Sequence, residues 1–204
     1  MCAVDWIPLL STVGGAAIAL IGTVLADILR TRGYRDRDNR AERRQGYVDF
    51  VLALNAAHAN LREVASVAAS SPDERWEAVR RAVADGRVYE AREQLLMSAN
   101  KEVVTVAERA FQGLLQVRDA VRAGANLRTV AYHGPYHQYA GALWKLRRTI
   151  RHDLGASYLS PKDLDKESWD GQSTCEVCQA ALPAVLPADS AEKSASSVPA
   201  QTAG

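Results

Sequence analysis

The sequence has few of the residue patterns that mark enzymes or disulfide-rich secreted proteins. Three cysteines in 204 residues are too few for a disulfide framework. There is no Gly-rich phosphate loop, no nucleophile elbow and no pair of carboxylates in an apolar setting. The formal net charge is only +1, which gives no bulk electrostatic attraction for nucleic acid. We therefore expect no enzyme, no catalytic residue, no cofactor and no nucleic-acid partner.

Charge is missing altogether from one stretch near the N-terminus. Residues 6–26 are twenty-one consecutive uncharged positions, and no Lys or Arg precedes Arg30. A helix needs about 20 apolar residues, at about 1.5 Å of rise each, to cross roughly 30 Å of hydrocarbon. A cleaved signal peptide, the competing interpretation, begins with basic residues and has an apolar stretch of about 7–15 residues. The uncharged start therefore favours a transmembrane anchor over residues 1–29.

A basic juxtamembrane segment, residues 30–44, follows the apolar run. It holds seven arginines and three acids, which gives 7 − 3 = +4. Because basic residues stay on the cytoplasmic side of a span, we predict a single-pass protein of the cell membrane with its N-terminus outside and its C-terminal domain cytoplasmic. The arginines expected to contact lipid headgroups are Arg30, Arg32, Arg35 and Arg37.

Small residues recur every four positions within the apolar run, at Ser11, Gly15, Ala19 and Thr23. This spacing places them on one helix face, where small side chains let two spans approach closely. The alternative is that small residues are simply common in such spans, so a homo-oligomer stays an open prediction. An oligomerising membrane effector is accordingly one alternative function.

Residues 45–157 carry apolar side chains every three or four positions, the spacing of helices that face a core. Ser71, with a proline after it and a glutamate three positions on, predicts a capped helix start. Pro135 predicts the start of the last helix and Gly155 its end. No long stretch alternates with a period of two. The expected fold class is all-α: a transmembrane helix, an antiparallel cytoplasmic helical bundle and, over residues 158–204, a disordered tail rich in Ser, Ala and Pro.

Two further pairs of residues have the spacing of metal ligands. Cys175 and Cys178 form a CxxC motif, but a zinc site needs four ligands and no His follows the motif in the tail. Cys2 is expected outside the membrane, so it cannot join them. His133 and His137 are four residues apart, yet Pro135 between them indicates a helix start that would leave His133 in the cap. We therefore predict no metal site, and keep a metal-binding or redox protein using either pair as an alternative.

The N-terminal third also resembles a known group of proteins. Its Trp-Ile-Pro-Leu-Leu start, its Gly-Gly-bearing span, its Arg-rich exit and the pattern Arg43-Arg44-x-x-Tyr47-x-x-Phe50 are similar to uncharacterised actinobacterial single-pass membrane proteins. The resemblance covers roughly the first 70 residues and implies topology without chemistry. The leading prediction is a membrane-anchored helical interaction module whose partners are the membrane and an unidentified cytoplasmic protein.

Overall fold

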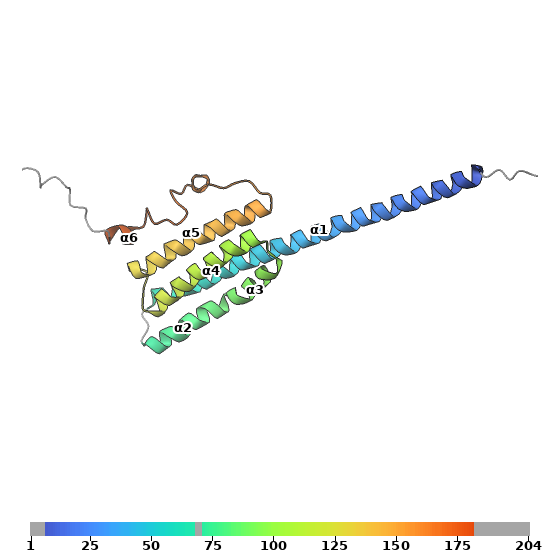
Figure 1. The fold of residues 1–204 in the computed structure, drawn as a ribbon. Helices are drawn as coiled ribbons and strands as arrows, with labels where there is room; N and C mark the ends of the chain where they lie inside the picture. The colour runs from blue at the N-terminus through green and yellow to red at the C-terminus, as the bar shows by residue number, and fades with distance from the viewer. Residues whose placement is uncertain (1–6, 68–70, 182–204) are drawn as a thin grey trace, which may run out of the picture.

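The computed structural model describes residues 7–67 and 71–181, with only the backbone at most positions up to residue 38. Within these residues every regular element is a helix, as the apolar periodicity predicts. In chain order the elements are α1 (Ile7–Ser66), α2 (Pro72–Asp85), α3 (Val88–Ser98), α4 (Lys101–Arg122), α5 (Val130–Asp153), the 3₁₀ turn η1 (Pro161–Leu164) and α6 (Glu176–Ala180). Figure 1 shows a bundle from which the first half of α1 projects as a long arm.

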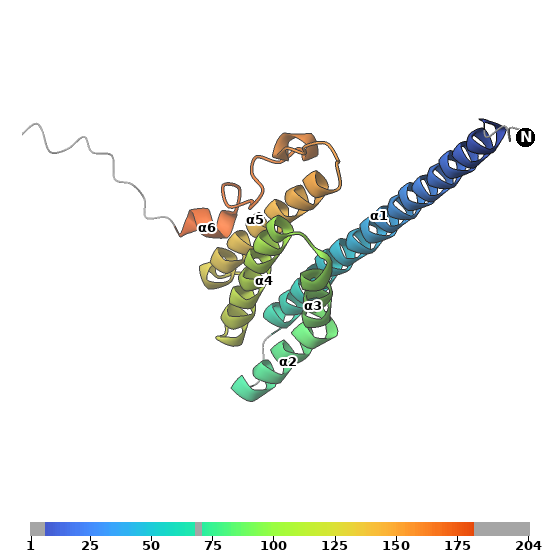
Figure 2. The ribbon, with the colours of Figure 1, turned by 45° about the vertical axis from the view of Figure 1, so that its right-hand side comes forward.

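The arm and the first helix of the bundle are one continuous element. α1 has 60 residues, which corresponds to about 90 Å of helix. Its only proline, Pro8, lies in the first turn, where the missing N–H costs no backbone hydrogen bond. Both ribbon views show α1 entering the bundle without a loop (Figures 1 and 2). The apolar run and the bundle are therefore joined by helix rather than by a flexible linker.

The hydrophobic core lies between the second half of α1 and helices α2 to α5. α4 and α5 lie side by side in an antiparallel pair, and α2 and α3 pack on the other side of α1 and α4 (Figures 1 and 2). The largest fully buried side chains are Tyr47, Tyr139, Phe50, Leu54, Leu61, Leu95, Leu114, Leu146 and four valines. The stripes in α1 and α4 agree with the spacing read from the sequence, and this confirms the predicted bundle.

Two glycines allow helices to approach more closely than a side chain would permit. A Cβ atom on Gly86, between α2 and α3, would lie 2.7 Å from the Cβ of Ala57 and 2.8 Å from its backbone nitrogen. A Cβ atom on Gly113 of α4 would lie 3.0 Å from the Cα of Tyr139 in α5. Both distances are shorter than ordinary carbon contacts of about 3.5–4.0 Å. Gly86 therefore sets how closely the α2–α3 connection approaches α1, and Gly113 sets how closely α4 approaches α5.

A cluster of hydrogen bonds between polar side chains lies at the end of the bundle nearest the arm. Asn100 caps α4 by accepting a hydrogen bond from the N–H of Val103 at 2.8 Å, and its side chain also donates to Asp153 of α5. The hydroxyl of Tyr47 in α1 donates to the same carboxylate at 2.7 Å. Burial, together with the neighbouring carboxylate, raises the pKa of Tyr47 to about 12. One carboxylate thus ties three helices together.

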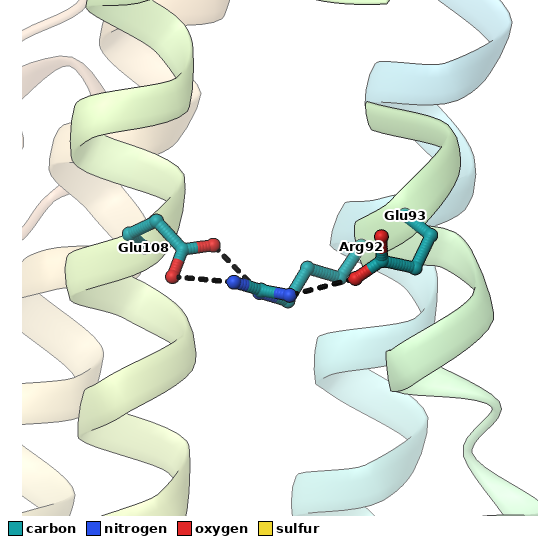
Figure 3. Close-up of polar contacts among 3 residues, drawn as sticks. All are labelled: Arg92, Glu93 and Glu108. Carbon is teal, nitrogen blue, oxygen red and sulfur yellow. Dashed lines mark hydrogen bonds and ion pairs between the residues drawn. The ribbon is translucent and has the colours of Figure 1, made fainter. Parts of the chain in front are cut away.

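Figure 3 shows an ion pair that joins α3 to α4. Nε and Nη2 of Arg92 donate to the two carboxylate oxygens of Glu108 at 2.6 and 3.0 Å, and Nη1 donates to Glu93 at 2.7 Å. The Arg92 side chain is 26% exposed, so water screens the contact only in part. Its guanidinium also lies 5.2 Å from the centre of the Phe111 ring. The short α3 helix is held to α4 by these contacts as well as by its buried apolar face.

After α5 the chain turns back along the same helix. Gly155, with φ +72°, allows Ala156 to donate to the carbonyl of Arg151 at 2.8 Å, which closes the helix where the sequence predicts. Residues 156–181, here called the return segment, then run along α5 toward its N-terminus (Figures 1 and 2). The prediction of a disordered tail from residue 158 is therefore wrong for residues 158–181. Residues 182–204 lie outside the described part.

Aromatic stacking holds the return segment in place. The rings of Trp144 in α5 and Trp169 in the segment stack with centroids 4.2 Å apart. Tyr158 lies under the guanidinium of Arg148 at 4.6 Å, and Arg151 donates twice to the carbonyl of Ser157. Such partners from α5 cannot be read from the composition of the tail, and this is why a segment without an apolar stripe is nevertheless packed.

Candidate metal centre

The far end of the return segment meets α5 at a cluster of two histidines and a cysteine. His133 and His137 lie one turn apart on α5, and Cys175 precedes α6 as its N-cap. Each of the three residues offers one ligand atom, and these atoms all lie within 4.8 Å of one another. In the described part of the chain this is the group of three that could hold a metal ion.

The ring of His133 is held in one tautomer by the backbone. Its Nε2 lies 2.8 Å from the carbonyl oxygen of Leu127. Because a carbonyl can only accept, Nε2 carries the proton, and in the neutral ring Nδ1 keeps its lone pair. That Nδ1 lies 3.4 Å from Sγ of Cys175. The lone pair needed for a metal bond therefore belongs to the nitrogen nearest the thiol.

His137 repeats this arrangement with its nitrogens exchanged. Its Nδ1 lies 2.7 Å from the carbonyl oxygen of Asp170 in the return segment, so Nδ1 donates and Nε2 has the lone pair. The residue is only 4% exposed, and Nε2 is buried without a hydrogen-bond partner. A buried polar atom left unpaired costs about 1–3 kcal/mol. A metal ion bound at Nε2 would remove that cost.

Asp170 is itself fixed by its neighbours. Its carboxylate accepts hydrogen bonds from the hydroxyl of Ser168 at 2.8 Å and from the N–H of Gln172 at 3.1 Å. These bonds hold the pKa of the Asp170 carboxyl below its usual value, and the bond from Gln172 has the largest effect. The turn they stabilise presents the Asp170 carbonyl to His137. Histidines that bind metals usually donate their second N–H to such an acceptor.

Cys178 is a further thiol beside the group of three. It lies in the first turn of α6, three residues after Cys175. Burial raises the pKa of the Cys178 thiol above its usual value, and the contact with Cys175 raises it further. Both cysteines are partly exposed. Two histidines and Cys175 therefore meet at one point, and Cys178 is a second thiol within one helical turn of Cys175.

The spacing of these atoms can be compared with that of a tetrahedral zinc site. Zn–N bonds of about 2.0–2.1 Å and Zn–S bonds of about 2.3 Å place neighbouring nitrogen and sulfur ligands about 3.6 Å apart. The observed 3.4 Å between Nδ1 of His133 and Sγ of Cys175 is close to this value. For the other distances among His133, His137 and Cys175, the upper limit of 4.8 Å implies a contraction of up to about 1.5 Å on binding. The residues present therefore fit a zinc ion.

The structure contradicts the predicted position of His133 in a helix cap. α5 begins at Val130, not at Pro135, so His133 lies inside the helix and on the same face as His137. Pro135 falls in the second turn, where the helix continues without its N–H. The CxxC motif was expected to lack histidines because none follows it in the tail. The return segment instead brings the motif to histidines about 40 residues earlier in the chain.

His58 belongs to the core. Its Nε2 lies 3.2 Å from the hydroxyl of Tyr132, and its ring is flanked by Tyr136 and Tyr139 at centroid distances of 5.2 and 5.1 Å. Burial, with a smaller effect from the charge of Arg62, lowers the pKa of His58 to about 4. It is a neutral packed histidine.

Most of the predicted membrane contacts lie outside the residues whose side chains are described. This holds for Ser11, Gly15 and Ala19 of the small-residue face and for Arg32, Arg35 and Arg37 of the headgroup set. Thr23 and Arg30 are described, and both are exposed. Within the described part of the chain, none of the helices has the length and hydrophobicity that crossing a bilayer requires.

Comparisons with known proteins do not place the chain in a family. No family model, no curated protein and no solved structure matches it.

Proposed function

We propose that this protein is a membrane-tethered helical module that binds one zinc ion through His133, His137, Cys175 and Cys178. The observation that carries the proposal is the buried, unpaired Nε2 of His137, in a ring whose other nitrogen is already bonded to a backbone carbonyl. Two thiolates and two neutral imidazoles form one of the usual ligand sets of structural zinc. Softer than oxygen ligands, they also disfavour magnesium and calcium.

The role of the zinc ion at this position is structural. Four protein ligands fill a tetrahedral shell and leave no open position for a substrate or an activated water. Two of the ligands belong to α5 and two to the end of the return segment. Zinc therefore joins the return segment to the bundle at the end farthest from the arm, while the stacked pair of Trp144 and Trp169 holds its middle.

The tether is the N-terminal half of α1. The uncharged run over residues 6–26 and the arginines over residues 30–44 support a single span with the bundle on the cytoplasmic side. The resemblance to actinobacterial single-pass proteins supports the same topology. Because α1 continues as helix to Tyr47, the bundle would begin about 26 Å beyond Arg30. A rigid arm of this kind would hold the module at a set distance from the membrane.

The module is proposed to bind another cytoplasmic protein. A cleft of about 420 Å³ between α2, α3 and α4 supports this part of the proposal. Trp76 and Tyr89 line it and are 45% and 47% exposed, which is unusual for large aromatic side chains. Arg118 and Arg122 lie beside them. Aromatic and arginine side chains are the types that most often dominate protein interfaces.

Zinc binding is tested on the full-length protein in detergent. We expect one zinc ion per chain after removal of metal by a chelator and reloading, measured by elemental analysis. Cobalt bound in place of zinc should show the visible absorption of a tetrahedral site with thiolate ligands. His137→Ala and Cys175→Ser should each lose stoichiometric metal, whereas His152→Ala, at an exposed histidine near the other end of α5, should keep it. Equal zinc content in all four proteins would refute the proposed ligand set.

The topology is tested separately in cells. A reporter that is active only in the cytoplasm, fused after Gly204, should be active, because the seven arginines lie on the C-terminal side of the apolar run. Replacement of Arg30, Arg32, Arg35 and Arg37 by Glu should weaken or invert the orientation. Activity of an external reporter at the unmodified C-terminus would contradict the proposed orientation.

A further inference from the structure

The two cysteines of the cluster are placed so that they can also bond to each other. Cys175 and Cys178 are three residues apart at the start of α6, and the Cys175 thiol is near enough to raise the pKa of the Cys178 thiol. One helical turn brings Cα atoms at this spacing to about 5 Å, inside the range of about 4.4–6.8 Å that a disulfide requires. Both side chains are partly exposed, so a small oxidant can reach them. The same sulfurs can therefore serve as zinc ligands or as a disulfide, but not as both.

We propose that Cys175 and Cys178 form a reversible oxidation site for a hydroperoxide, and that their oxidation releases the zinc ion. This inference rests on the zinc site proposed above. It adds a chemical partner, a hydroperoxide, and an outcome, detachment of the end of the return segment from α5. The predicted cytoplasmic side of the membrane keeps thiols reduced under ordinary conditions, so disulfide formation there reports oxidation.

The chemistry balances in two steps. One thiolate sulfur attacks the terminal oxygen of the hydroperoxide and the O–O bond breaks, which yields a sulfenic acid and, after protonation, an alcohol or water. The second thiolate then attacks the sulfenic sulfur, forms the S–S bond and expels hydroxide, which takes a proton to become water. In total two thiolates, one hydroperoxide and two protons give one disulfide, one alcohol and one water. The two thiolates lose two electrons, and the peroxide gains them.

Zinc leaves because the disulfide removes two of its four ligands. Thiolates bind zinc strongly, whereas disulfide sulfurs carry no negative charge, and only His133 and His137 remain. The part of the return segment beyond Gly171 then loses its metal attachment to α5. Its remaining anchor is at Asp170 and Trp169, where His137 and Trp144 hold it. A thiol reductant restores the dithiol by exchange and allows zinc to bind again.

The test uses the full-length zinc-loaded protein in detergent and hydrogen peroxide as the probe. Zinc release is followed with a chromophoric chelator, and free thiols are counted in parallel. We expect one zinc ion to be released for every two thiols lost at the motif, and dithiothreitol followed by zinc to restore the starting state. Both cysteines fall in one tryptic peptide, residues 167–193, which should become lighter by two hydrogen atoms. Cys2→Ser should behave like the parent.

A second variant separates oxidation from metal loss. Cys178→His keeps a zinc ligand at this position but cannot form the disulfide, so it should hold zinc at peroxide concentrations that empty the parent. Absence of stoichiometric zinc before peroxide is added would refute the proposed function. Zinc that is bound but retained after oxidation, or released without the lighter peptide, would overturn this inference and leave the zinc site standing. The parent protein alone decides between these outcomes if Cys178→His does not fold.

Discussion

Trp169→Ala is the substitution that most directly tests how the return segment supports the candidate metal centre. The indole of Trp169 stacks on Trp144 with 4.2 Å between centroids and an interplanar angle of 27°. The next residue, Asp170, supplies the carbonyl that fixes the His137 ring. Removal of the indole therefore loosens the segment directly beside one of the proposed ligands, without altering any ligand.

The size of the effect follows from the contact that is lost. An aromatic pair contributes about 0.5–1.5 kcal/mol beyond its buried area, and a partly buried indole adds a similar amount. The free energy with which the return segment packs on α5 should fall by about 1–2 kcal/mol. This lowers the fraction of metal-free protein in which all four proposed ligands face one another. The apparent zinc dissociation constant rises by the inverse of that fraction. We therefore expect an increase of up to about 5- to 30-fold.

Zinc affinity is measured by competition with a chromophoric chelator, again on the full-length protein. Trp76→Ala is the matched control because it removes the same side chain from α2, on the side of the bundle away from the return segment (Figure 1). The control should bind zinc as the parent does. If Trp169→Ala and Trp76→Ala have the same dissociation constant as the parent, the return segment does not organise the site and the reasoning fails.

Three further predictions concern the bundle. Gly86→Ala should destabilise the protein by about 1–3 kcal/mol in chemical unfolding, because the added Cβ meets the backbone of α1. Gly134→Ala, with open space around it, should stabilise the protein by about 0.5–1 kcal/mol. Equal effects of the two substitutions would contradict the close approach of Gly86 to α1. The pKa of His58 is about 4 in the folded protein, below the ordinary 6.5, so the unfolded state binds more protons between these pH values. Metal-free protein should therefore lose up to about 3 kcal/mol of folding stability between pH 6.5 and 4. The His58→Gln variant should lose less over the same range. In a double-mutant cycle, Arg92→Met and Glu108→Gln should show a coupling energy of about 1 kcal/mol, and added salt should reduce this energy. A coupling energy of zero would mean that the ion pair in Figure 3 contributes no stability.

Features encoded by neighbouring residues could be predicted from the sequence. The cap at Ser71 accepts the predicted hydrogen bond from the N–H of Glu74 at 3.2 Å, and α5 ends in the turn at Gly155. The core stripe of α1 also follows directly from its spacing. Each of these depends on residues three or four positions apart, and such residues are neighbours on any helix regardless of what surrounds it.

The start of α5 shows where local signals fail. Pro135 is a common first residue of a helix, yet the helix begins at Val130. Hydrogen bonds within the preceding turn favour this earlier start, since the hydroxyl of Thr129 donates to the carbonyl of Asn126 at 2.8 Å. The tertiary contacts of Tyr132, which is buried against His58, add to it. A proline in the second turn removes one backbone hydrogen bond, and these contacts outweigh that cost.

The sequence by itself determined the helical class, the positions of most helices and the charge pattern on which the proposed orientation in the membrane depends, because these are properties of composition and short-range spacing. Only the tertiary structure decided that residues 156–181 return along α5 and that Cys175, with Cys178 three residues later, meets His133 and His137. Each pair has metal-ligand spacing alone, but neither completes a four-ligand set. Contacts across about 40 residues depend on the direction of the chain after Gly155 and on the Trp144–Trp169 stack, and no local pattern specifies either one.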